Sequence, residues 1–191
     1  MTRSFFSSPL RGPWLQALVL GGLLWAAQAQ ASAPMQAVPA LDVPRYLGRW
    51  YEVAKLPNWF QRQCARDTSA EYRAQATGEL QVINRCRKAS GEMIEAQGLA
   101  RQLGGAQSAT LQVRFAPAWL SWLPLVWGDY WVVDLDPAYD LVAVSEPRRE
   151  YLWILSRQPK VDPQRYRALL DRLAGMGLPV EQLELTEHSA P

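Results

Sequence analysis

Histidine and cysteine, the side chains most often used for catalysis and metal binding, are scarce in this chain of 191 residues. The one histidine, His188, lies close to the C-terminus, and the two cysteines, Cys64 and Cys86, stand 22 residues apart without a close second pair. A zinc site needs several such ligands close together. A serine or cysteine nucleophile needs an adjacent base, yet there is no G-x-S-x-G motif. The residues therefore predict no metal site, no cofactor and no histidine-assisted catalysis.

A pair of carboxylates, Asp134 and Asp136, could in principle act as general acid and base. Both lie where a predicted strand enters a turn, a position at which acidic residues are common. We therefore favour a solvated turn over a catalytic dyad, and we predict that the chain is not an enzyme.

The first 31 residues have the features of a secretory signal peptide. Two arginines precede an apolar run at 14–27, and small residues follow at Ala29, Ala31 and Ala33. The run of about 14 residues is shorter than the roughly 20 that a membrane-spanning helix needs. We favour cleavage after Ala31, with Ala29 and Ala33 as alternatives. No cysteine lies near the cut to accept a lipid, so we expect release into the periplasm.

The remaining chain of about 160 residues suits one domain. The predicted signal peptide contains two of the 20 basic residues and no acidic one. The mature chain therefore has 18 basic and 18 acidic residues and no formal net charge. Binding to nucleic acid requires an excess of basic residues. We therefore expect no nucleic-acid partner.

From Leu41 onward, apolar residues recur mainly with a period of two, and turn residues interrupt the pattern at intervals of about ten. The pattern predicts an all-β domain of eight strands, at 48–56, 65–74, 79–87, 92–102, 108–115, 129–135, 140–145 and 151–157. Short connections favour an antiparallel up-and-down β-barrel, whose interior can hold one small ligand. We expect this domain to span 44–187, between a loose lead at 32–43 and a frayed tail at 188–191.

Two cysteines in an exported chain favour a disulfide, because the compartment is oxidising. Cys64 would begin the second strand and Cys86 would end the third, so the hairpin brings both toward one rim. A count from the intervening turn places Cys64 about three residues beyond direct opposition to Cys86, an offset that a loop or bulge can absorb. One reactive thiol at each position is the alternative.

One amphipathic α-helix is predicted after the eighth strand. Asp162 has the residue type of an N-cap, and Gly175 or Gly177 would end the helix. The apolar residues at helical spacing are Tyr166, Leu169, Leu170 and Leu173. This stripe has to be buried, and the outside of the barrel is the only large surface available. A short strand at 183–185 should follow.

Two loops of the predicted meander are unusually apolar. The first contains Trp59 and Phe60, and the later one contains Trp119 and Trp122 among other large apolar residues. Alternate connections of a meander project from the same end, so we expect both loops to share a rim and to form a ligand entrance. The alternative is a lid that buries its own aromatic side chains.

Alternate residues of each strand face the barrel interior. The eighth strand is apolar on both faces, and if the helix covers one face, Tyr151, Trp153 and Leu155 line the interior. The matching residues of the sixth strand are Tyr130 and Val132, and the phenol of Tyr130 could bond a ligand head group. We predict that these five residues form a ligand-binding wall. Ordinary core packing is the alternative.

Three motifs, in order along the chain, resemble those of the lipocalin family. Gly48 and Trp50 match its G-x-W signature, Asp136 occupies the place of its T-D-Y turn, and Arg157 ends a segment similar to its closing arginine motif. The resemblance spans residues 44–186, and several strands are similar in sequence to bacterial outer-membrane lipocalins and apolipoprotein D. It implies that these four residues are structural, with the guanidinium of Arg157 over the indole of Trp50.

The resemblance also implies a function, namely storage or transport of fatty acids or lysophospholipids in the bacterial cell envelope for membrane maintenance under stress. Leu135 and Pro137 depart from the middle motif, and the lipidation cysteine of the bacterial lipoproteins is missing. The second departure favours a diffusing periplasmic carrier over one tethered to the outer membrane. Two alternatives remain. One is an enzyme with a pocket cysteine as nucleophile, and the other is an interaction module whose aromatic rim docks on a membrane or forms a homodimer.

Overall fold

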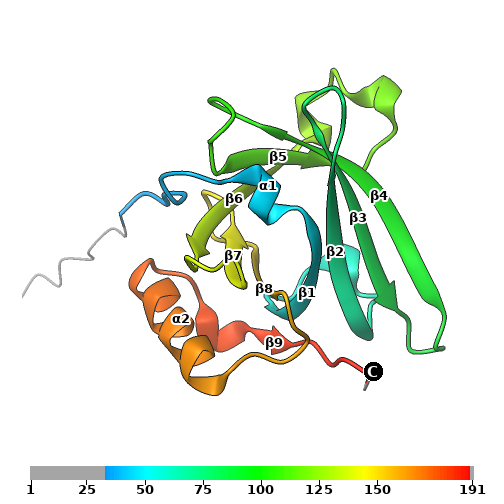
Figure 1. The fold of residues 1–191 in the computed structure, drawn as a ribbon. Helices are drawn as coiled ribbons and strands as arrows, with labels where there is room; N and C mark the ends of the chain where they lie inside the picture. The colour runs from blue at the N-terminus through cyan, green and yellow to red at the C-terminus, as the bar shows by residue number, and fades with distance from the viewer. Residues whose placement is uncertain (1–32, 190–191) are drawn as a thin grey trace, which may run out of the picture. The chain divides into compact units, whose positions relative to one another are not determined.

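Eight strands follow one another as antiparallel neighbours in the computed structural model, which describes residues 33–189 (Figure 1). They are β1 (Gly48–Lys55), β2 (Arg66–Ala74), β3 (Leu80–Arg87), β4 (Met93–Gln102), β5 (Thr110–Arg114), β6 (Gly128–Leu135), β7 (Leu141–Ser145) and β8 (Leu152–Ser156). β1 pairs with both β2 and β8, which closes the sheet into a barrel. The eight predicted strands are confirmed to within two residues at each end.

A ninth, very short strand completes the barrel wall. β1 pairs with β2 only over its first four residues. Beyond them, β9 (Glu184–Leu185) pairs with the end of β1, and the carbonyl of Glu187 accepts a hydrogen bond from the amide of Asp67 in β2. The C-terminal segment therefore fills the gap between the two strands. The prediction of a frayed tail at 188–191 is wrong for His188, whose Nε2 lies 2.7 Å from the carbonyl oxygen of Glu52.

The helix α2 (Pro163–Gly175) packs on the outside of the barrel, as predicted (Figure 1). Asp162 caps it, because its side chain accepts hydrogen bonds from two backbone amides of the first turn. Leu169 and Leu173 are fully buried in an outer apolar cluster that includes Ile154 of β8. The opposite face of β8 packs in an inner apolar cluster within the barrel. These two layers explain why β8 is apolar on both faces.

Short helical turns occupy several connections. They are α1 (Val43–Tyr46), η1 (Trp59–Gln61), η2 (Ala118–Leu120), η3 (Pro124–Val126) and η4 (Val180–Gln182). Between residues 33 and 189, no helix has the length and apolar character needed to cross a membrane.

The N-terminal lead is packed against the barrel. Met35 and Leu41 are buried in the outer and inner clusters, respectively. The amide of Val38 also donates a hydrogen bond to the carbonyl of Val132 in β6. The prediction of a loose lead at 32–43 is therefore wrong for this segment, because its apolar side chains contribute to both clusters. The predicted signal peptide at 1–31 lies outside the described residues.

Candidate ligand-binding site

Trp50 and Arg157 lie together where β1 begins and β8 ends. Trp50 is fully buried, and the guanidinium carbon of Arg157 lies 3.9 Å from the centroid of its ring. The guanidinium nitrogens donate to three backbone carbonyls, those of Arg45, Arg49 and Tyr139. Gly48 adopts a φ of +91°, a conformation that other residues rarely adopt. This end of the barrel therefore has the stacking that the family resemblance implied.

The carboxylates of Asp134 and Asp136 are held by two arginines of α2. Asp134 accepts hydrogen bonds of 2.7 and 2.9 Å from Arg172. One oxygen of Asp136 pairs with Arg165, and the other accepts from two amides of the β6–β7 turn at 2.7 and 3.1 Å. Both carboxylates thus connect the end of β6 to α2, which accounts for their position without a catalytic role.

Four of the predicted wall residues lie in or against the inner apolar cluster. Val132 is fully buried and Leu155 is 5% exposed, whereas Tyr130 and Trp153 are only partly buried. A solid core leaves no such surface on its inward-facing side chains. Tyr130 and Trp153 therefore lie where the interior of the barrel meets solvent.

The fifth wall residue, Tyr151, lies in an aromatic cluster at the opposite end of β8 from Arg157. Its ring stacks on Trp153, with centroids 5.8 Å apart. Phe60 packs against both rings at 5.5 and 6.1 Å, and Trp59 meets Phe60 edge-on at 5.6 Å. We call Trp59, Phe60, Tyr151 and Trp153 the mouth cluster. The structure thus brings two predicted entrance residues against two predicted wall residues.

The second aromatic loop, between β5 and β6, is strongly exposed. Trp119 and Trp122 are each 74% exposed and Leu125 is 97% exposed, so the alternative of a self-burying lid is wrong for this loop. Trp127 holds the loop to the barrel, because the guanidinium of Arg101 on β4 lies 4.0 Å from its ring centroid. Among the described residues, no aromatic pair links this loop to the mouth cluster, and a shared rim stays a prediction.

The phenol of Tyr130 is engaged by two tyrosines that sequence reasoning missed. Its Oη lies 2.7 Å from Oη of Tyr46 and 2.8 Å from Oη of Tyr72. Tyr72 occupies an inward position of β2, which the period-two pattern could have revealed. Tyr46 ends the four-residue helix α1, which is too short to show a periodicity. We call Tyr46, Tyr72 and Tyr130 the tyrosine triad.

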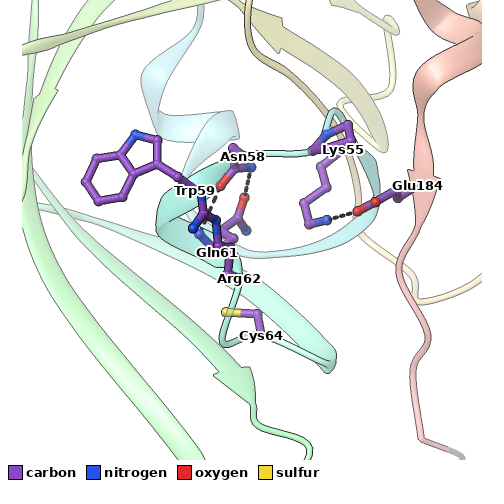
Figure 2. Close-up of a pocket in the computed structure, with 8 residues that line it drawn as sticks. Lys55, Asn58, Trp59, Gln61, Arg62, Cys64 and Glu184 are labelled. Carbon is purple, nitrogen blue, oxygen red and sulfur yellow. Dashed lines mark hydrogen bonds and ion pairs between the residues drawn. The ribbon is translucent and has the colours of Figure 1, made fainter.

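A surface pocket of about 440 Å³ lies where the loop after β1 meets β9 (Figure 2). The ion pair between Lys55 and Glu184, at 2.6 Å, forms one side of the pocket, and Trp59 of the mouth cluster contributes to the other. Arg62 and Cys64 also line the pocket. The pocket therefore adjoins the mouth cluster from the outside.

Cys64 is bonded to Cys86, and their Cα atoms lie 5.4 Å apart. A bulge in β2, which contains Asp67 at a φ of +56°, takes up part of the predicted offset in register, and Cys64 lies in the loop before β2. The predicted disulfide is confirmed. Because these are the two cysteines of the chain, the alternative of a pocket cysteine acting as nucleophile is wrong.

A buried carboxylate connects the mouth to the C-terminal segment. Glu52 is 2% exposed, and its two oxygens accept hydrogen bonds from Nε2 of Gln61 at 2.7 Å and from Oγ1 of Thr186 at 2.6 Å. Gln61 in turn accepts from the indole N–H of Trp153 at 2.9 Å. Burial raises the pKa of Glu52, against the lowering effect of its two hydrogen bonds.

Replacement of Glu52 by glutamine should leave the protein at least as stable as the wild type near neutral pH. The new amide can accept from Gln61 through its oxygen and donate to Thr186 through its nitrogen, while the cost of burying a charge is removed. Glu52→Ala is the matched comparison, and it should lower the free energy of unfolding by about 1–3 kcal/mol because Gln61 loses its acceptor. Urea denaturation of the three proteins measures both effects.

The same variants should show how the contribution of Glu52 to stability depends on pH. Because the folded-state pKa of Glu52 is raised above its ordinary value of 4.5, the contribution of this group to stability is greatest below that value and is lost as the pH rises through the folded-state pKa. The free energy of unfolding of the wild type, taken relative to Glu52→Gln, should therefore fall as the pH rises above about 4.5. A difference that stays constant, or that rises, would contradict this assignment.

Known proteins match most of the chain. Residues 41–188 match the family model described as a lipocalin-like domain. The chain is 38% identical over 141 residues to the outer membrane lipoprotein Blc of Vibrio cholerae, across 73% of this chain and 75% of that protein. It is 30% identical over 184 residues to apolipoprotein D of Mus musculus, across 89% and 92%.

A solved structure shows the same architecture. Insecticyanin from the tobacco hornworm Manduca sexta superposes with a TM-score of 0.64 at 18% identity, over 83% of this chain and 87% of that chain. At this identity the likeness concerns the fold alone. With the family model and the two relatives, the resemblance inferred from three short motifs is confirmed. The chain belongs to the lipocalin family.

Proposed function

We propose that this lipocalin carries a fatty acid or a lysophospholipid whose acyl chain occupies the barrel interior. Lipocalins bind small hydrophobic molecules. The observation that carries the proposal is the partial exposure of Tyr130 and Trp153 on the inside of the barrel, next to an aromatic mouth. Each buried methylene contributes about 0.8 kcal/mol, so a long chain suffices for micromolar binding.

The wall and the entrance follow from the same geometry. The wall would consist of Tyr130, Val132, Tyr151, Trp153 and Leu155. Trp59 and Phe60 would form the entrance, joined by Trp119 and Trp122 if the two loops share a rim. We propose binding without catalysis, in keeping with the relatives that match this chain.

We propose that the carrier acts in the bacterial cell envelope. Relatives from Vibrio cholerae and Citrobacter freundii are outer membrane lipoproteins, which supports an exported protein. Residues 1–31 would direct export to the periplasm, and the lipid cargo would serve membrane maintenance under stress.

A tryptophan quenching titration tests the carrier function. Protein stripped of lipid should show a saturable fluorescence change with a fatty acid or a lysophospholipid, since Trp153 and Trp59 lie at the mouth. Val113→Trp places a much larger side chain in the interior, and displacement of about two methylenes of the ligand is enough to weaken binding about tenfold in calorimetry.

The matched control for Val113→Trp is the same substitution at the neighbouring position. Gln112 faces outward, where its side chain bonds Arg101, whereas Val113 packs against the inner cluster. Gln112→Trp should therefore bind lipid like the wild type. No saturable change in the stripped wild type, or equal affinity in the two variants, would refute binding inside the barrel.

We propose as a second function that the β5–β6 loop docks on a membrane surface. Residues 115–127 contain no charged side chain, and Trp119, Trp122 and Leu125 are largely exposed. Tryptophan is favoured at membrane–water interfaces, and the exposed cation of Arg101 beside the loop suits anionic head groups. Such docking would bring the mouth of the carrier close to its lipid source.

Cosedimentation with anionic liposomes tests this docking. Serine at Trp119, Trp122 and Leu125 should weaken liposome binding by at least about tenfold, because three large apolar side chains are lost. Met93→Ser is the control, since Met93 is 45% exposed on β4 outside the loop. Sedimentation velocity without liposomes measures self-association. A homodimer that depends on the loop, combined with no liposome binding, would assign the loop to a subunit interface and refute docking.

A further inference from the structure

Arg114, at the end of β5, is a buried cation without a counter-ion. It is 7% exposed, and among residues 33–189 it is the only basic residue that is buried. Its side chain lies on the outer face of the barrel, because its neighbour Val113 packs against the inner cluster. Arg114 forms no ion pair with any carboxylate of the described chain. Such a charge has lost water without gaining an opposite charge, which is costly.

The guanidinium of Arg114 also has unused hydrogen-bond donors. Its Nη1 donates to the carbonyl of Ala116. Its Nε is buried and has no partner within residues 33–189, and Nη2 makes no hydrogen bond there either. The ring of Trp127, 5.2 Å from the guanidinium carbon, offsets only part of the missing charge. The edge formed by Nε and Nη2 matches two oxygens of one carboxylate or phosphate, so the free edge suits an oxyanion.

Arg114 lines a pocket of about 360 Å³ between the β2–β4 part of the sheet and the start of the β5–β6 loop. The lining contains no acidic residue. Glutamine amides, which can donate hydrogen bonds, come from three positions, Gln75, Gln81 and Gln97. The loop contributes only small side chains, those of Ala116 and Ala118. The pocket therefore combines a cation, amides and open space.

The charges around the pocket also favour an anion. Glu95, which accepts a hydrogen bond from one of the lining glutamines, is already paired with Arg85 at 2.8 Å. The guanidinium of Arg101 lies 4.0 Å from the centroid of the same Trp127 ring that Arg114 approaches. Two cations beside one ring repel each other. An anion bound at Arg114 would relieve this repulsion.

The loop beside the pocket indicates where the anion comes from. Ala116 and Ala118 are followed directly by the exposed side chains of Trp119 and Trp122. If these indoles lie at a membrane–water interface, the start of the loop lies at the level of the lipid phosphates. We propose that the pocket of Arg114 binds the phosphate of one membrane phospholipid when the loop docks. This inference rests on the proposed docking function and adds a head-group site to it.

Glycerophosphoglycerol, a phospholipid head group without acyl chains, tests the pocket apart from the membrane and from the barrel interior. Calorimetry at constant ionic strength should show saturable binding to the wild type. Binding should be at least about fivefold tighter than that of inorganic phosphate, because the pocket also has room for the glycerol groups beside the glutamines. Arg114→Met should weaken it at least about tenfold, since methionine fills similar space without a charge or donors.

Arg73→Met is the matched control. Arg73 lies on the outer face of β2, its side chain is 54% exposed, and it is not part of the pocket lining. This variant should bind the head group like the wild type. No saturable binding to the wild type, or equal affinity in the wild type and Arg114→Met, would overturn the pocket. Tighter binding of inorganic phosphate than of the head group would overturn the lipid source and assign the pocket to free phosphate.

Vesicles separate this inference from the docking function. Digalactosyldiacylglycerol forms bilayers without phosphate, and a second set of vesicles contains phosphatidylglycerol as well. On the galactolipid alone, the wild type and Arg114→Met should cosediment equally, because the exposed apolar side chains of the loop are present in both. With phosphatidylglycerol, the wild type should bind at least about tenfold more tightly than Arg114→Met. Arg73→Met, which has the same net charge as Arg114→Met, again serves as the control.

The two ideas fail in different ways. Equal binding of the wild type and Arg114→Met to vesicles with phosphatidylglycerol would overturn the head-group site and leave docking intact. Absence of binding to both kinds of vesicle would overturn docking and the membrane source together, even where the soluble head group still binds.

Discussion

Replacement of Trp50 by alanine should lower the free energy of unfolding by about 3–5 kcal/mol. Trp50 is fully buried, packs on Tyr46 and donates its indole N–H to the carbonyl of Tyr46 at 2.8 Å. Alanine leaves a cavity between strands that are fixed by their ladders, and it removes the ring beneath the guanidinium of Arg157. Urea denaturation followed by circular dichroism measures the change.

Trp59→Ala is the matched control, because it deletes the same side chain from a position that is 68% exposed. Its free energy of unfolding should stay within about 0.5 kcal/mol of the wild type. A similar loss in both variants would show that Trp50 is not a structural element of the barrel end.

The strands and the outer helix were predictable because their signals are local. Alternation along most of the strands follows from one buried and one outward face, and Asp162 is a cap that needs no tertiary context. The bond between Cys64 and Cys86 was predictable because both lie on one hairpin, with a single bulge at Asp67 between them. Each of these features depends on residues close together in sequence.

The packed ends of the domain were not predictable for the opposite reason. Met35 and Leu41 belong to a proline-containing segment without periodicity, and they are buried only because two distant clusters receive them. His188 is ordered by the carbonyl of Glu52, which precedes it by more than a hundred residues. Such contacts have no local signature.

The candidate site shows the same division. Pleat alternation, together with a helix over the other face of β8, places Trp153 and Leu155 inward and matches them with Tyr130, and the structure has all three in or against the inner cluster. What the phenol of Tyr130 bonds was not accessible from sequence, since Tyr46 and Tyr72 reach it from two other elements. The hydrogen bonds inside the barrel thus depend on residues from separate elements, which come together only in the folded protein.

Loss of the disulfide should lower the free energy of unfolding by about 3 kcal/mol, because the bond closes a loop of about 20 residues in the unfolded chain. Cys86 is 4% exposed, so alanine is a better replacement than serine, whose hydroxyl would be buried there. Cys64→Ala, Cys86→Ala and the double variant should all lose about the same amount. Urea denaturation without reductant measures the three values.

Equality of these three values is the decisive point, since each variant abolishes one and the same bond. Independent side-chain effects at two sites add, whereas a shared covalent link is lost completely with either partner. Reductant should destabilise the wild type to the level of the double variant and leave the double variant unchanged. If the single losses instead sum to the double loss, the two positions stabilise the β2–β3 hairpin through packing. The covalent link between the β1–β2 loop and β3 would then add nothing to the free energy of unfolding.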